Sequence, residues 1–242
     1  MSEPRDLVFP DEPRRILEGV EGWLLKHFPK RALVIGGGTV LASRWSHRVS
    51  TDCDMFADEQ VFRDVDFDAL RHECKVQTGR GGLLRARLFR QGLFLETRDG
   101  ELSLVGDRAH QRRHPTDRIG DLDIHPVEEV LRRKMEFRLV TQGLVEERDL
   151  YDFAVAACVE TEAMERVLWG ADEITGEWMG ARLRQSVATG SKSLLKPHCS
   201  ELALELEDFA VQLFQFGATE FNRRHGAMIR TGLSIGQEGM QR

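Results

Sequence analysis

Two aspartates, Asp52 and Asp54, stand one residue apart in a segment that has the alternating character of a β-strand. Residues i and i+2 of a strand project to the same face, so both carboxylates point together while Cys53 and Met55 turn toward the core. Two like charges on one face repel each other, and a divalent cation between them removes that cost. The pair therefore predicts a metal site for Mg²⁺ or Mn²⁺.

A glycine-rich turn precedes this pair. The apolar run at residues 32–35 is typical of a buried strand, and three consecutive glycines and Thr39 follow it. A short helix is expected from there to Trp45. Backbone N–H groups at such a turn and helix N-terminus form an anion site, which glycine lets a phosphate approach closely. Gly37, Gly38 and Thr39 are therefore candidate phosphate ligands, and a metal beside them suits a nucleoside triphosphate.

Neither feature is specific alone, because three glycines can form a simple tight turn and Asp-x-Asp is a common pair. Together they form a Gly-Gly-Thr-x-Leu segment followed by His-Arg-x-Ser-x-Asp-x-Asp-hydrophobic-Phe. The residues are Gly37, Gly38, Thr39, Leu41, His47, Arg48, Ser50, Asp52, Asp54 and Phe56. This order resembles the DNA polymerase beta-like nucleotidyltransferase superfamily. Within it, the segment is most similar to the AbiEii-type enzymes, which include MenT-like toxins of type IV toxin–antitoxin systems.

The resemblance implies that a nucleoside monophosphate is moved from a nucleoside triphosphate to an acceptor hydroxyl. An RNA end such as that of tRNA, or a protein, is the favoured acceptor, with a small molecule such as an aminoglycoside as a further alternative. A toxin role implies a cognate antitoxin as partner. Arg48 and Ser50 are expected near the nucleotide, since a guanidinium binds phosphate in a bidentate way. His47 is expected at the rim of the site or on phosphate.

A second match lies downstream, where the family carries a helix with Lys and Arg and then an Arg-Asp-hydrophobic-x-Asp helix. Lys134 and Arg138 are four residues apart, and Asp149 and Asp152 are three apart, so each pair shares a helical face. A lysine that reaches the triphosphate would stabilise charge on the leaving group, and either aspartate could orient it. The alternative is a solvated helix face with salt bridges between the two helices.

The pattern departs from the family at the third carboxylate, which a later strand usually supplies. Residues 102–105 are its natural place, yet they contain no acid. Glu96 lies within a strand pattern and is the preferred third metal ligand, with Glu101 and Asp107 as nearby alternatives. Without a third acid, the chain could be a degenerate member that binds a nucleotide or a partner without catalysing transfer.

The pattern of the whole chain predicts an α+β fold, in which a small mixed sheet flanked by helices precedes a helical C-terminal region. Helices are expected over 11–28, 64–74, 126–139, 147–160 and 201–224, and further strands over 52–56, 83–89, 93–97 and 102–105. We expect a nucleotidyltransferase-like domain over 1–160 and a helical region over 161–242.

Composition narrows the class of protein further. The chain has 242 residues, and no apolar run approaches the roughly 20 residues that cross a bilayer. Its start lacks a signal-peptide pattern, and its four cysteines form no Cys-x-x-Cys pair. We therefore expect a soluble cytoplasmic protein without membrane, disulfide or zinc. The net charge of −6 is unlike that of a general nucleic-acid binder, so RNA would need a local basic patch such as residues 108–114.

Overall fold

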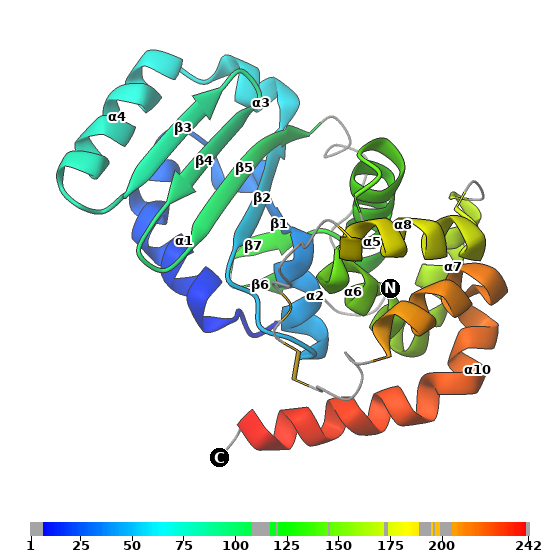
Figure 1. Ribbon diagram of the computed structural model, residues 1–242. Coiled ribbons are helices and arrows are strands. Elements are labelled where there is room, and N and C mark those ends of the chain that lie inside the picture. Colours follow the sequence, from blue (N-terminus) through cyan, green and yellow to red (C-terminus); the bar gives the residue numbers. More distant parts are fainter. Residues whose placement is uncertain are drawn as a thin grey trace. The chain divides into compact units, whose positions relative to one another are not determined.

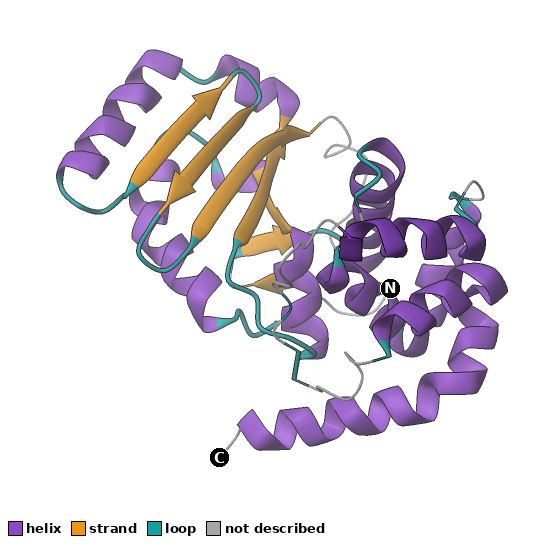
Figure 2. Ribbon diagram, in the orientation of Figure 1, coloured by secondary structure: helices purple, strands orange, loops and turns teal. Residues whose placement is uncertain are grey.

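The computed structural model divides the chain into two compact units. The first comprises Met1–Arg44 and Ser50–Pro126, and the second comprises Trp45–Val49 and Val127–Arg242. All strands of the described residues belong to the first unit (Figure 2). The structure describes residues 7–107, 117–119, 121–144, 146–171, 174–188, 195, 197–198 and 205–240. The basic patch at 108–114 lies outside these residues.

A mixed seven-stranded sheet, counted over the described residues, forms the first unit (Figure 1). Its spatial order is β3-β4-β5-β2-β1-β7-β6, in which β1–β7 and β2–β5 are parallel and the other neighbours are antiparallel. The strands are β1 (Leu33–Gly36), β2 (Cys53–Asp58), β3 (Arg85–Phe89), β4 (Gly92–Glu96), β5 (Glu101–Asp107), β6 (Arg118–Ile119) and β7 (Leu122–Ile124). The α+β fold class is thus confirmed.

One face of this sheet is the core of the first unit. On β2 the residues Cys53, Met55 and Ala57 are fully buried, while the alternating residues, including Asp54, are half-buried. Helices α1 (Asp11–Leu24) and α3 (Glu59–Asp64) contact β2 and β5, and α4 (Phe67–Gly79) contacts β3. The period-2 pattern therefore directs the Asp54 side chain to the face opposite this core.

The second unit is helical and is organised around α6 (Glu147–Val159). Residues 149–158 of α6 are all buried, because this helix packs against both α7 (Thr161–Trp169) and α10 (Leu206–Met240). Gly217, with φ 81° and ψ 169°, interrupts α10. The remaining helices are α5 (Val127–Arg133), the π-helix η3 (Lys134–Thr141) and α8 (Gly176–Ala188). None of the helices in the described part of the chain is long and apolar enough to cross a bilayer.

Several elements differ from the sequence-based expectation. The strands β6 and β7 and the helix α3 are additional, and α1 ends at Leu24 instead of residue 28. The expected domain boundary after residue 160 stays a prediction, but the second compact unit resumes at Val127 and so includes α6 together with the C-terminal helices. The physical reason is that α6 packs against α7 and α10, so it groups with the C-terminal helices.

The turn between β4 and β5 yields a stability prediction. Gly100 has φ +142°, and a Cβ there would clash with the backbone oxygen of Thr51, next to Asp52. Gly81 also has a positive φ, +76°, but a Cβ there would meet open space. Gly100→Ala should therefore destabilise the protein by about 1–3 kcal/mol more than Gly81→Ala, as measured by urea unfolding. Equal losses would show that the contact with Thr51 is immaterial.

Candidate functional site

The glycine turn and the Asp54 carboxylate adjoin each other in the first unit. β1 leads directly into α2 (Gly37–Trp45) at Gly37, whose φ is +64°. Gly36 pairs with Asp54 across the antiparallel strands β1 and β2. A Cβ on Gly37 would clash with the carboxylate of Asp54, so only glycine leaves room there. The N-terminus of a helix and a carboxylate are thus held side by side.

Asp52 lies just before β2, which begins at Cys53. Its backbone oxygen accepts a hydrogen bond from Thr39 Oγ1, which also lies 2.9 Å from Ser50 Oγ. Thr39 and Ser50 are both buried. The two hydroxyls therefore hold the segment before β2 against α2, and their contact with a phosphate stays a prediction.

The residue opposite Asp54 on the neighbouring parallel strand is Ser103. Its hydroxyl donates a hydrogen bond of 2.7 Å to Asp54 Oδ1. Glu96, the expected third ligand, lies on β4 opposite Glu101 and is separated from β2 by β5. Its placement therefore gives its metal role no support. The sequence did not predict Ser103, because the alternation of β5 indicates which residues share a face but not their register with β2.

The donor set fits one kind of metal site. Among the residues that the structure describes, no group of three His, Cys, Asp or Glu side chains could hold a metal ion. Mg²⁺ is commonly bound by one or two carboxylates together with water and substrate phosphates. Two carboxylates such as those of Asp52 and Asp54 would suit an ion whose ligands a bound triphosphate completes, and their binding of a metal stays a prediction.

His125 is a further buried residue beside the turn, and the sequence did not predict it. The backbone N–H of His125 donates a hydrogen bond of 2.8 Å to the backbone oxygen of Ile35. The centre of its ring lies 4.7 Å from the centre of the Phe56 ring. A Cβ on Gly36 would lie 2.9 Å from His125 Nδ1. Asp107 Oδ2 lies 3.9 Å from His125 Nε2. No sequence signal pointed here, because the three residues of β7 are too few to show a period.

The core side of β2 carries an unreactive thiol. Burial raises the pKa of the Cys53 thiol, and the negative charges of Asp54 and Asp52 raise it further. The thiol is therefore protonated at neutral pH, and Cys53 acts as a small core residue.

In the second unit, the buried carboxylate of Asp152 is surrounded by cationic and polar groups. Arg48 donates to it through Nε at 2.7 Å and Nη2 at 2.9 Å, and His47 Nε2 lies 2.6 Å from Oδ1. Lys134 Nζ lies 3.1 Å from Oδ2. All four side chains are buried. Since the guanidinium fork of Arg48 is engaged by Asp152, its predicted contact with phosphate stays a prediction.

Lys134 stands at the start of the π-helix and is held by two acids. Its Nζ forms a short ion pair with Asp149 in addition to its contact with Asp152. Arg138 Nη1 lies 3.1 Å from Asp149 Oδ2 and 2.5 Å from Glu146. Both predicted aspartates thus contact the predicted lysine. A π-helix is rare and often marks a functional site, which agrees with a special role for this segment.

The charge states in this cluster follow from its geometry. Burial would raise the pKa of Asp152, but the charges of Arg48 and Lys134 and the hydrogen bonds hold it well below its ordinary value. Burial lowers the pKa of His47 despite its bond to Asp152. Because a carboxylate oxygen only accepts, neutral His47 donates from Nε2. No described residue bonds to its Nδ1.

Each unit therefore gathers a separate subset of the predicted site residues. Gly37, Gly38, Thr39, Ser50, Asp52, Asp54 and Glu96 lie in the first unit, and His47, Arg48, Lys134, Arg138, Asp149 and Asp152 lie in the second.

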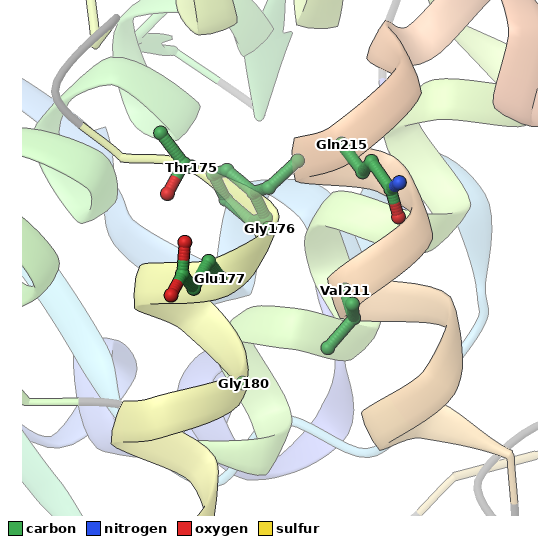
Figure 3. A pocket seen from close by; sticks show the side chains of 7 residues that line it. Thr175, Gly176, Glu177, Gly180, Val211 and Gln215 are labelled. Carbon is green, nitrogen blue, oxygen red and sulfur yellow. The ribbon is translucent and has the colours of Figure 1, made fainter.

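A surface pocket of about 590 Å³ lies in the second unit, between the start of α8 and α10 (Figure 3). Gly176, Phe214 and Gln215 are part of its lining, and Glu177 is the one charged residue among the described residues that line it. Because that charge is negative, the pocket does not suit a triphosphate, and it contains none of the predicted site residues.

Comparisons with known proteins give distant structural similarity only. No protein-family model matches the chain, and no curated protein matches it. A protein from H. pylori, provisionally described as a nucleotidyltransferase, has 14% identity and a TM-score of 0.44, over 93% of this chain and 95% of that one. JHP933 from Helicobacter pylori has 11% identity and a TM-score of 0.40, over 97% of both chains. TM-scores below 0.5 do not by themselves assign a fold family.

We expect the loss of unfolding free energy to differ strongly between substitutions of two aspartates, one buried and one exposed, that each pair with a lysine. Asp152→Asn would leave the buried charges of Arg48 and Lys134 uncompensated and should cost about 3–5 kcal/mol of unfolding free energy. The matched control is Asp121→Asn, which breaks the exposed pair with Lys30 at 2.8 Å and should leave the unfolding free energy nearly unchanged. Urea unfolding measures both. Similar losses would contradict the central role of Asp152.

His47 predicts a pH effect. Because its folded pKa lies below the ordinary value of 6.5, the unfolded chain binds this proton at a higher pH than the folded chain does. The contribution of neutral His47 to the free energy of unfolding is therefore complete above about pH 6.5 and is lost as the pH falls below that value. His47→Gln retains a donor for Asp152 but does not titrate. Its unfolding free energy should fall less between pH 6.5 and 5, by up to about 1.4 kcal/mol per pH unit. Parallel profiles would refute this.

Proposed function

We propose that this protein is a metal-dependent nucleotidyltransferase that moves a nucleoside monophosphate from a nucleoside triphosphate to an acceptor hydroxyl. One observation carries the proposal: the Asp54 carboxylate adjoins a glycine turn that opens a helix. Such a turn is suited to a phosphate, and the Asp52–Asp54 pair is suited to Mg²⁺ or Mn²⁺. A bound nucleoside triphosphate satisfies both requirements at once.

In this proposal Asp52 and Asp54 hold the ion, and the backbone at Gly37 and Gly38 binds phosphate oxygens. When bound, the ion would activate the attacking hydroxyl as a nucleophile and would neutralise the negative charge on the leaving oxygens. Lys134 stabilises the charge that develops on the departing pyrophosphate. The contacts of Lys134 with Asp149 and Asp152 support this role, because they fix the position of its ammonium group.

The finer assignments rest on the resemblance of the segment from Gly37 to Phe56. It favours an AbiEii-type enzyme, with RNA such as tRNA or a protein as acceptor. A toxin of this type would have a cognate antitoxin as partner. Thr39, His47, Arg48, Ser50 and Arg138 are proposed to support the nucleotide, either directly or by holding the residues that contact it.

A second candidate function is favoured by Ser103. It occupies the place opposite Asp54 where a third carboxylate would be expected, and it donates a hydrogen bond to that aspartate. A site with two carboxylates can bind a nucleotide with its metal yet lack the base that activates an acceptor. The alternative is therefore a nucleotide-binding module without transferase activity.

The first experiment is a transfer assay. The full chain is incubated with Mg²⁺ and each α-labelled nucleoside triphosphate, with total RNA, tRNA and protein extract added in turn. We expect label on one acceptor and its loss in the Asp52→Asn/Asp54→Asn variant, because this variant lacks the negative charge that holds the ion. Equilibrium binding of the same nucleotides to both proteins is measured in parallel.

The two functions give different results. The transferase is supported if the unchanged protein labels an acceptor and the Asp52→Asn/Asp54→Asn variant does not. Mg²⁺-dependent nucleotide binding without label on any acceptor supports the binding module. A protein that neither binds nucleotide nor transfers label would refute both.

A further inference from the structure

The sheet face that bears Asp54 continues onto the outer strands β4 and β3. Arg87 pairs with Phe94, Phe94 with Ser103, and Ser103 with Asp54, so these four residues form one row across four strands. Directly paired residues project to the same face. The hydrogen bond from Ser103 to Asp54 shows this for the inner pair. Given neighbouring strands about 4.8 Å apart, Phe94 lies roughly 10 Å from Asp54 along the row.

Two aromatic rings are exposed on this outer part of the face. The exposed fractions of Phe89 and Phe94 are 54% and 36%, and their ring centres lie 5.7 Å apart in an edge-on arrangement. On the opposite face of β4, the side chains of Leu93 and Leu95 are at most 1% exposed. The exposed rings are therefore not a remainder of the core, which lies on the opposite side.

Two arginines of β3 accompany these rings, although the whole chain has a net charge of −6. Arg85 and Arg87 alternate with Ala86 on β3 and so share the face of the two rings. The guanidinium of Arg87 lies 6.0 Å from the centre of the Phe94 ring. The nearest acid in this register is Glu96, opposite Arg85.

We infer that these four residues, Arg85, Arg87, Phe89 and Phe94, which we call the β3–β4 platform, bind a single-stranded nucleic acid. Its bases stack on the two rings, and its phosphates contact the arginines. The nucleic acid bound in this way places its terminal hydroxyl toward Asp54, where that hydroxyl is the acceptor. This last step rests on the proposed function, whereas binding of the strand does not.

Arginines on an edge strand also have a simpler role, since they hinder pairing with a strand of another chain. That role needs no exposed aromatic ring, yet the platform presents two beside the arginines. Interleaved cationic and aromatic side chains on an open sheet face are what base stacking and phosphate contact require together.

The test measures binding of a fluorescent single-stranded RNA of about 12 nucleotides, and of DNA of the same sequence, to the full chain by anisotropy, without nucleotide or metal. Phe94→Ala should weaken binding roughly 5- to 150-fold, the range expected for one lost stacking interaction. The matched control is Phe216→Ala. Phe216 is 39% exposed and also has an arginine, Arg224, over its ring, but it lies on α10.

The arginines are tested through salt dependence. Arg85→Gln/Arg87→Gln should reduce the slope of log affinity against log salt by about 1.4, because single strands contribute about 0.7 for each of the two neutralised phosphates. Thermal unfolding of every variant establishes that the fold is retained. Absence of saturable binding by either oligonucleotide, or equal losses in Phe94→Ala and Phe216→Ala, would overturn the inference.

The inference and the proposed function can fail separately. Binding that Phe94→Ala weakens, in a protein that transfers no label, would support the platform and count against the transferase. Transfer to RNA with an unchanged KM for RNA in Phe94→Ala would support the transferase and overturn the platform.

Discussion

The helical unit depends on the neutralisation of one buried charge. An ionised carboxylate is stable away from water only if cations and hydrogen-bond donors surround it. Asp152 on α6 obtains these from Arg48 and His47, and from Lys134 at the start of η3. The requirement fixes three segments that are far apart in sequence. It also immobilises the ammonium group of Lys134, which two carboxylates hold.

The sheet unit obeys a different constraint, which is one of space. At Gly36 a side chain would collide with Phe56 and His125, and at Gly37 it would collide with the Asp54 carboxylate. The glycines therefore do more than relax the backbone. Because they lack side chains, the start of α2 lies directly against the Asp54 carboxylate. A metal on that carboxylate and a phosphate at the start of the helix would need the same close approach.

The sequence predicted what depends on local pattern. The buried strand before the glycines and the alternation of Cys53 and Met55 with Asp54 are both present, because such patterns reflect the period of a strand. The short strand β7 escaped prediction, and with it the position of His125. The bond between Arg48 and Asp152 joins residues 104 positions apart, and no periodicity reports such a contact. Likewise, Ser103 became meaningful only once the register placed it opposite Asp54.

The path of the chain has a consequence for dissecting this protein into fragments. Residues 45–49 belong to the helical unit, although the segments on either side of them belong to the sheet unit. The polypeptide thus passes between the units at three places, so no single proteolytic cut separates the two units with both of them complete. A fragment starting at Val127 would contain Asp152 without His47 and Arg48, and its carboxylate would lose most of its compensation. The helical unit is therefore complete only when residues 45–49 are present together with Val127–Arg242.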